Sequence, residues 1–199
     1  MSKNKLQEKR LKAMEKYIKK SIRIRGKDYI TESSIEYGVI GNKYLCDGCC
    51  YLTTKDDMSS LPQSTNEIKN NLDDRLEYEK NLIEIDKTYN IDINKLISDI
   101  KTDGFKDTIK QLEYEENHPS EKYVVYINDT FLDYRLFYKA YMCIDNNEVC
   151  KVSDILDYKN PIYIKNDIGE CLILPFNTFG KTEDTLNSFK CYNLLDYVV

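Results

Sequence analysis

Several residue types are scarce in this chain of 199 residues, and each scarcity excludes a class of function. Tryptophan is absent, His118 is the only histidine, and there are only seven glycines. No Gly-rich phosphate loop, no G-x-S-x-G and no H-E-x-x-H motif occurs. A catalytic histidine needs an orienting partner and a nucleophile, and the sequence around His118 nominates neither. We therefore expect a surface histidine and a protein that is neither an enzyme nor the holder of a cofactor.

Long hydrophobic runs are also missing. No stretch approaches the roughly 20 apolar residues that a membrane-spanning helix needs. The opening MSKNKLQEKR has no apolar core of the kind found in secretory signals. The many residues with AT-rich codons fit a low-GC bacterium or its phage. We therefore expect a cytoplasmic protein of a bacterial host cell that does not associate with a membrane.

The cysteines do not form a complete metal or disulfide pattern. They number seven, an odd count that favours reduced thiols in a cytoplasm. Cys46, Cys49 and Cys50 have half of a zinc-site spacing, and the nearest second pair is Cys143 and Cys150. A predicted helix end and strand start separate that second pair, so packing of cysteines as small hydrophobes is favoured. The adjacent acidic residues of the chain are interpreted as solvated faces rather than Mg²⁺ ligands. No metal site is predicted.

Charge is distributed unevenly along the chain. The net charge is −5, but residues 1–27 carry eleven Lys or Arg against Glu8 and Glu15. That segment is therefore +9, which leaves −14 for residues 28–199. A basic arm on an acidic body points to a polyanionic partner.

Residues 3–22 have the pattern of an amphipathic helix. Leu11, Met14, Ile18 and Ile22 form an apolar stripe, and the remaining face is almost entirely Lys and Arg. Two interpretations remain open. The helix could dock on the body with lysines that only keep it soluble, or its basic face could contact nucleic-acid phosphates.

The second interpretation assigns eight residues to phosphate contacts. They are Lys9, Arg10, Lys12, Lys16, Lys19, Lys20, Arg23 and Arg25. Aromatic residues do not alternate with these charges in the way typical of single-strand binders, so contact with the backbone of DNA, independent of sequence, is expected.

Residues 123–176 are the best-patterned part of the chain. The pattern predicts a strand at 123–127, a helix from Phe131 to Tyr141 and strands at 149–152, 161–164 and 171–174. Residues 166–170 are expected to join the last two strands as a hairpin. Residues 3–54 show similar content, because short runs at 37–40, 43–46 and 49–53 follow the N-terminal helix. A unit that occurs twice suggests internal duplication.

The remaining segments connect and extend these two units. Residues 55–66 have loop composition, and residues 67–121 are expected to be helical and are acidic, with fifteen Asp or Glu against eight Lys or Arg. Asp92 is expected to cap a helix that continues to about Ile100. In the tail, 177–199, the apolar end 191–199 fits either an edge strand or a short helix.

The second unit resembles the repeating half-domain of the DNA polymerase sliding clamp. The residues that carry the resemblance are the run 162–164, the turn 167–169 and the return Leu-Ile-Leu-Pro at 172–175. Upstream, NKYLCDGCCYL is similar to a hairpin of small clamp-like proteins of phages and prophages, through Asn42, Tyr44, Asp47 and Gly48. Cys49 and Cys50 stand where those proteins have Tyr-Arg, so any role of that arginine is absent.

The resemblance implies an α+β fold in which antiparallel β-sheets are covered by helices. The chain would be a single clamp-like domain with a first half at 1–54, an acidic helical insertion at 55–121, a second half at 122–176 and a tail at 177–199. A homo-oligomer is compatible with this organisation.

Two functions follow as hypotheses. The first is a non-enzymatic phage or prophage accessory protein that engages DNA, or DNA replication and processing proteins, through the basic N-terminal helix. The alternative is a counter-defence protein that inhibits a host nuclease through its acidic surface.

Overall fold

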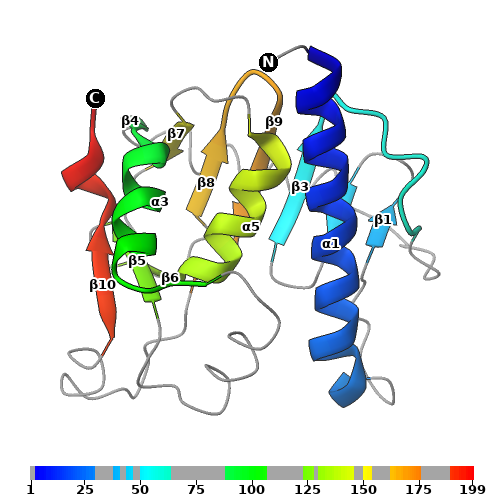
Figure 1. Cartoon of the computed structure of the whole chain (residues 1–199), viewed down its shortest axis with the longest axis horizontal. Coiled ribbons are helices and arrows are strands. Elements are labelled where there is room, and N and C mark those ends of the chain that lie inside the picture. Colours follow the sequence, from blue (N-terminus) through cyan, green and yellow to red (C-terminus); the bar gives the residue numbers. More distant parts are fainter. Residues whose placement is uncertain are drawn as a thin grey trace.

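The computed structural model describes residues 3–29, 38–40, 44–46, 50–63, 88–106, 123–127, 130–145, 150–153, 162–175 and 189–199. The fold is α+β, as the sequence predicted, with a layer of helices over a large β-sheet and a smaller sheet beside it (Figure 1). The described helices are α1 (Lys3–Tyr29), α3 (Ile93–Thr102), α5 (Tyr134–Ile144) and the short 3₁₀ helix η2 (Leu194–Tyr197). The strands are β1 (Gly38–Ile40), β2 (Tyr44–Cys46), β3 (Cys50–Thr54), β4 (Thr88–Ile91), β5 (Tyr123–Ile127), β6 (Thr130–Asp133), β7 (Cys150–Ser153), β8 (Ile162–Lys165), β9 (Gly169–Ile173) and β10 (Lys190–Asn193).

The large sheet joins the two predicted units through their last strands. Its order is β1-β2-β3-β9-β8-β7-β4, and each neighbouring pair of strands is antiparallel. At the centre, β3 pairs with β9 in a register that places Cys50 opposite Ile173 and Leu52 opposite Cys171. The expected hairpin between β8 and β9 is present. The two units are thus halves of one sheet rather than separate domains.

Each unit consists of a helix followed by three antiparallel strands. In the first unit α1 precedes β1, β2 and β3, and in the second α5 precedes β7, β8 and β9. The strands of the two units are arranged symmetrically about the β3–β9 pair, as β1-β2-β3 and β9-β8-β7, with β4 added beyond β7. Helices α1 and α5 pack beside each other in front of the sheet (Figure 1). This arrangement agrees with the repeated helix-and-strand content of the sequence.

The core lies between this sheet and the helices. Alternate residues of the central strands, including Leu52, Ile164 and Ile173, are fully buried beneath the helices. Met14 and Ile18 of α1 belong to the same core, and both are buried, as the apolar stripe predicted. Because the period of a strand is two and that of a helix is 3.6, these patterns bury one face of each element.

Helix α1 is longer than the sequence predicted. It continues past residue 22 and through Gly26 to Tyr29. A 27-residue helix is about 40 Å long, whereas the 11 residues of α5 span about 16 Å. The C-terminal half of α1 therefore extends beyond the end of α5 (Figure 1).

The predicted helix start at Phe131 is also wrong. Residues 130–133 form strand β6, which pairs with β5 as a hairpin in which Tyr126 and Phe131 stack with ring centroids 5.4 Å apart. The helix begins after Asp133, whose carboxylate accepts a hydrogen bond from the backbone N–H of Arg135 at 2.9 Å. This side-chain cap satisfies an N–H that has no partner within the helix, and it fixes where α5 begins.

The segment 55–121 is not purely helical. Asp92 caps α3 as predicted, accepting a hydrogen bond from the N–H of Lys95 at 3.0 Å. However, Thr88–Ile91 forms strand β4, which pairs with β7 at one end of the large sheet. Pairing with a strand about 60 residues away decides this assignment, because the local sequence alone has no strong preference. The rest of the segment expected to be helical, residues 67–87 and 107–121, lies outside the described residues.

The chain itself covers both outer strands of the large sheet. Val39 of β1 donates its N–H to the Pro62 carbonyl at 3.0 Å. On the other side, the N–H of Val199 donates to the carbonyl of Asn90 in β4 at 3.0 Å. Covered edges resist the addition of further strands.

The C-terminal segment forms both elements that the sequence left open. Strand β10 adds to β5 in parallel, giving the small sheet the order β10-β5-β6. Asn193 then caps η2 by accepting a hydrogen bond from the N–H of Leu195 at 3.1 Å. Leu194 and Tyr197 are buried, so the tail is part of the core.

Candidate nucleic-acid interface

The exposed face of α1 is basic along the part whose side chains are described, residues 5–18. Lys5, Lys12 and Lys16 are exposed, whereas Met14 and Ile18 face the core. Helical geometry explains the separation, because residues three to four positions apart share a face. The helix therefore docks by its apolar stripe and still presents ammonium groups to solvent.

Arg10 does not belong to this exposed face. Only 5% of its surface is accessible, and its guanidinium group donates two hydrogen bonds to the carboxylate of Asp56, from Nε at 2.5 Å and from Nη2 at 2.9 Å. Nη1 donates to the backbone carbonyl of Asp145 at 3.2 Å. Arg10 is therefore withdrawn from the predicted phosphate contacts. The helical pattern had placed Arg10 on the exposed face. Instead, the Asp56 carboxylate and the Asp145 carbonyl, which come from distant parts of the chain, hold its guanidinium group in the interior.

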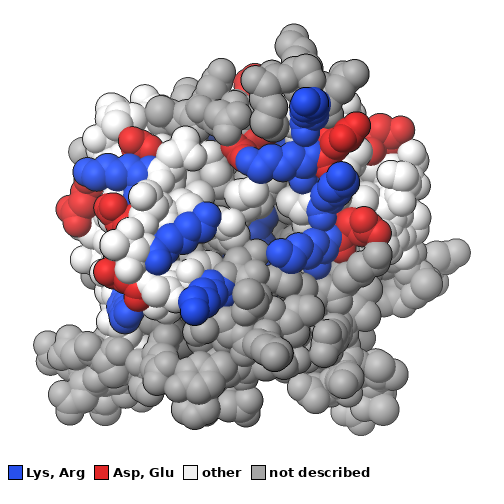
Figure 2. Space-filling view, viewed as in Figure 1, with Lys and Arg blue, Asp and Glu red and all other residues white. Residues whose placement is uncertain are grey.

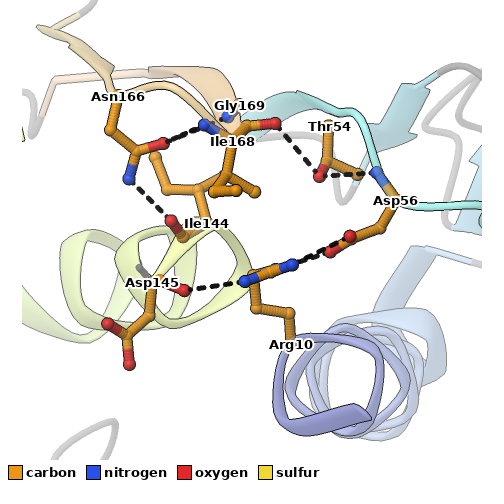
Figure 3. Close-up of polar contacts among 8 residues, drawn as sticks. All are labelled: Arg10, Thr54, Asp56, Ile144, Asp145, Asn166, Ile168 and Gly169. Atoms are coloured by element: carbon orange, nitrogen blue, oxygen red, sulfur yellow. Dashed lines mark hydrogen bonds and ion pairs between the residues drawn. The ribbon is translucent and has the colours of Figure 1, made fainter. Parts of the chain in front are cut away.

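Arg10 joins α1 directly to the segment after β3 and to the end of α5, and through Asp56 to the β8–β9 turn (Figure 3). Asp56 follows the end of β3, and its backbone N–H donates to the hydroxyl of Thr54 at 3.2 Å. The Thr54 hydroxyl in turn donates to the carbonyl of Ile168 in the β8–β9 turn at 3.4 Å. The side-chain hydrogen bond to Asp56 raises the pKa of Arg10, so the guanidinium stays charged in the interior.

The same network stabilises the C-terminal end of α5. The amide of Asn166 donates to the carbonyl of Ile144 at 2.6 Å, and Arg10 satisfies the next carbonyl, that of Asp145. The carboxylate of Asp145 would be unfavourable beside the negative end of the helix dipole. It forms an ion pair with Lys9, which offsets that repulsion. Lys9 is thus partly engaged, although 41% of its side chain remains accessible.

Of the eight residues predicted to contact phosphates, four are described only by their backbone positions. Lys19, Lys20, Arg23 and Arg25 lie within the C-terminal half of α1. Their side chains are outside the described part of the structure, and their role stays a prediction.

The neighbouring helices add lysines that sequence reasoning did not connect with α1. The Nζ of Lys139, on α5, lies 5.6 Å from the ring centroid of Tyr17 on α1. On α3, the Nζ of Lys101 lies 5.5 Å from the ring of Tyr138. A cation is attracted to the face of an aromatic ring, so these contacts hold the lysines against the helix layer. Figure 2 shows basic side chains spread over this face.

Acidic side chains interrupt the basic surface. Glu8 is exposed and Glu15 partly exposed among the lysines of α1. On α5, Arg135 is occupied by a salt bridge to Asp133. The surface therefore offers separated lysines rather than a continuous cationic groove. Such an arrangement suits contact with a regularly charged backbone better than capture of one small anion.

The acidic segment that motivates the inhibitor hypothesis is only partly described. Within residues 88–106 three aspartates are balanced by three lysines. Two of these aspartates bind tyrosines of the C-terminal segment: Asp99 accepts a hydrogen bond from the Tyr197 hydroxyl at 3.2 Å, and Asp103 accepts one from Tyr192. The excess negative charge of residues 67–121 therefore lies in 67–87 and 107–121, outside the described residues.

The other chemical candidates were the cysteines and His118. No group of three or more His, Cys, Asp or Glu in the described part of the chain is placed to hold a metal ion. Cys50 is buried and its Sγ contacts the Sγ of Cys171 at 2.8 Å. Cys49 and His118 lie outside the described residues, as does the side chain of Cys46.

No protein-family model, curated protein or solved structure matches this chain. None of the helices in the described ranges is long and apolar enough to cross a membrane.

Proposed function

We propose that this chain is a non-enzymatic DNA-binding accessory protein of the phage or prophage type and that its helix layer contacts the phosphate backbone. The observation that carries the proposal is the set of exposed lysines on the docked helix α1, Lys5, Lys12 and Lys16, with Lys139 beside them on α5. Each phosphate neutralised by a lysine releases counterions, which favours association with nucleic acid of any sequence.

The chemistry of this face favours backbone contacts over base recognition. Lysine ammonium groups are point charges, whereas base edges are read mainly by arginine, asparagine and glutamine side chains inserted in a groove. The one arginine of α1 whose side chain is described, Arg10, is buried. The protein would thus bind duplexes without sequence preference.

The topology supports the proposed relationship to sliding clamps. Two units of one helix and three strands form a common sheet, with both helices on the face that carries the lysines. Because the chain covers β1 and β4 with its own residues, copies would not join by extending this sheet. A single copy would then contact a duplex from one side.

The test is the affinity for duplex DNA across a salt series, measured by fluorescence anisotropy. Charge reversal with Lys12→Glu and Lys16→Glu should weaken binding and reduce the slope of log K against log salt by about 1.8, the value for two phosphate contacts. Substitution is preferable to deletion of the helix, because Met14 and Ile18 belong to the core.

The matched control is Lys165→Glu. Lys165 is exposed, but it alternates with the buried Ile164 along β8 and so lies on the sheet face away from the helices. This variant should retain the affinity and slope of the parent. Equal losses in Lys165→Glu and in Lys12→Glu alone, which change the net charge by the same amount, would indicate an effect of net charge only. If the parent fails to bind at low salt, the proposal fails and the nuclease-inhibitor hypothesis takes its place.

A further inference from the structure

Two buried thiols meet at the centre of the large sheet. The Sγ atoms of Cys50, in β3, and Cys171, in β9, are 2.8 Å apart. A disulfide bond is about 2.05 Å long, so bond formation requires the sulfur atoms to approach by about 0.8 Å. Both cysteines are reduced in this structure, and at most 1% of either residue is accessible to solvent.

The two cysteines are diagonal neighbours across the β3–β9 pair. In the register of these strands Tyr51 lies opposite Leu172, and each cysteine immediately precedes its member of that pair. The two side chains therefore lie on either side of the Tyr51–Leu172 pair and on the same face of the sheet. Both side chains point to the helix-covered face, since Leu52 and Ile173, two residues further along each strand, are also buried there.

We propose that Cys50 and Cys171 form a redox-sensitive pair that hydrogen peroxide converts to a disulfide joining the two units. The thiolate of one cysteine attacks the peroxide O–O bond and becomes a sulfenic acid, releasing hydroxide. The second thiolate attacks that sulfur, forms the S–S bond and expels the sulfenic oxygen as hydroxide. The two thiol protons neutralise the two hydroxides, so two thiols and one peroxide give one disulfide and two waters.

Burial decides which oxidants can act on this pair. Large disulfide reagents need an opened sheet, whereas peroxide is a small molecule and needs only a small local opening to reach the thiols. The product would connect strands that are far apart in the sequence, and a cross-link that closes a long loop restricts the unfolded chain most. Oxidation should therefore raise the melting temperature without altering the exposed lysine face.

The experiment uses the full chain treated with hydrogen peroxide, alkylated and digested without reduction. The expected product is a cross-linked pair of peptides containing Cys50 and Cys171, accompanied by a loss of about 2 Da in intact mass that dithiothreitol reverses. Cys46 and Cys49 share a tryptic peptide with Cys50, so the digestion is repeated with the variant Cys46→Ala/Cys49→Ala, in which the cross-link should persist.

Two further variants separate the pair from general thiol oxidation. Cys171→Ala should lose both the cross-link and the rise in melting temperature, whereas Cys143→Ala, which alters another buried cysteine, should keep both. Alkylation of Cys50 and Cys171 in the peroxide-treated parent, or linkage of either residue to a different cysteine, would overturn the proposal. Because the parent chain alone gives this readout, a variant that fails to fold does not obscure the result.

Discussion

The two units of the large sheet place a helix in the same position but use it differently. Helix α5 is short, and seven of its eleven residues are buried. Helix α1 is 27 residues long, and of its described side chains only Arg10, Met14, Tyr17 and Ile18 are buried. The comparison shows that α5 is mainly a structural element. The described part of helix α1 provides polar surface beyond what packing needs, and Lys5, Lys12 and Lys16 of the proposed interface lie on that surface.

The two helices are also fixed by different forces. Helix α5 is held by apolar packing and by the Asp133 cap at its first turn. Among its described side chains, residues 5–18, helix α1 has fewer buried apolar residues, and it depends in addition on the ion pair between Arg10 and Asp56. A buried pair of this kind is costly to break, because removal of one partner leaves the other charge without compensation.

The largest effect is expected from breaking this pair. Arg10→Met should lower the free energy of unfolding by about 3–5 kcal/mol, because the carboxylate of Asp56 would remain buried without its partner. Chemical denaturation monitored by circular dichroism provides the measurement. Removal of both charges in Arg10→Met/Asp56→Asn should restore at least half of the loss. If Arg10→Met alone is neutral, then packing alone holds α1, and the contrast with α5 disappears.

A smaller effect is expected at the first turn of α5. Asp133→Ala should lower the free energy of unfolding by about 1 kcal/mol, because the N–H of Arg135 loses its acceptor. Asp133→Asn is the matched variant, since its amide oxygen can still accept this hydrogen bond. Nearly equal losses for Ala and Asn would assign the effect to the salt bridge with Arg135 instead of the cap.

The smallest effect concerns pH and the C-terminal segment, which supports the second unit. Burial, together with the hydrogen bond to Asp99, raises the pKa of Tyr197 to about 12. An unfolded tyrosine has a pKa near 10, so the folded state holds this proton more tightly. The corresponding stability is present below about pH 10 and is lost as the pH rises toward 12.

The variant Tyr197→Phe isolates this contribution from the lysines that titrate in the same range. The difference in unfolding free energy between parent and variant should shrink by at most about 1 kcal/mol between pH 9 and pH 12, because solvent screens a site near the surface. Urea titrations at several pH values would measure it. A difference that stays constant with pH would show that the hydroxyl of Tyr197 is not tightly protonated in the folded state.

Local pattern in the sequence predicted many of the elements. The apolar stripe of α1, the Asp92 cap of α3 and the hairpin between β8 and β9 follow from residues within a few positions of one another. Side-chain periodicity and capping are short-range effects, so a single sequence contains the information needed. The start of α5 could also have been predicted, because aspartate is a favourable N-cap residue. The apolar residues before Asp133, however, extended the helical pattern toward the N-terminus.

The sequence was a poorer guide to which residues come together at the candidate site. The basic face of α1 could be identified from helical spacing, but Lys139 comes beside it, and Lys101 comes beside α5, only through packing of the helices. Arg10 had the same local pattern as its lysine neighbours. Its burial depends on Asp56 and Asp145, which are 46 and 135 positions away.

The sequence by itself determined the α+β content, the repeated helix-and-strand unit and the separation of a basic helix from an acidic body. Tertiary structure alone decided that β3 pairs with β9, that Cys50 meets Cys171 and that β10 joins β5 in parallel. The physical reason is the range of the forces involved. Backbone propensity and periodicity act over a few residues, whereas strand pairing and buried ion pairs form only when folding brings distant segments together.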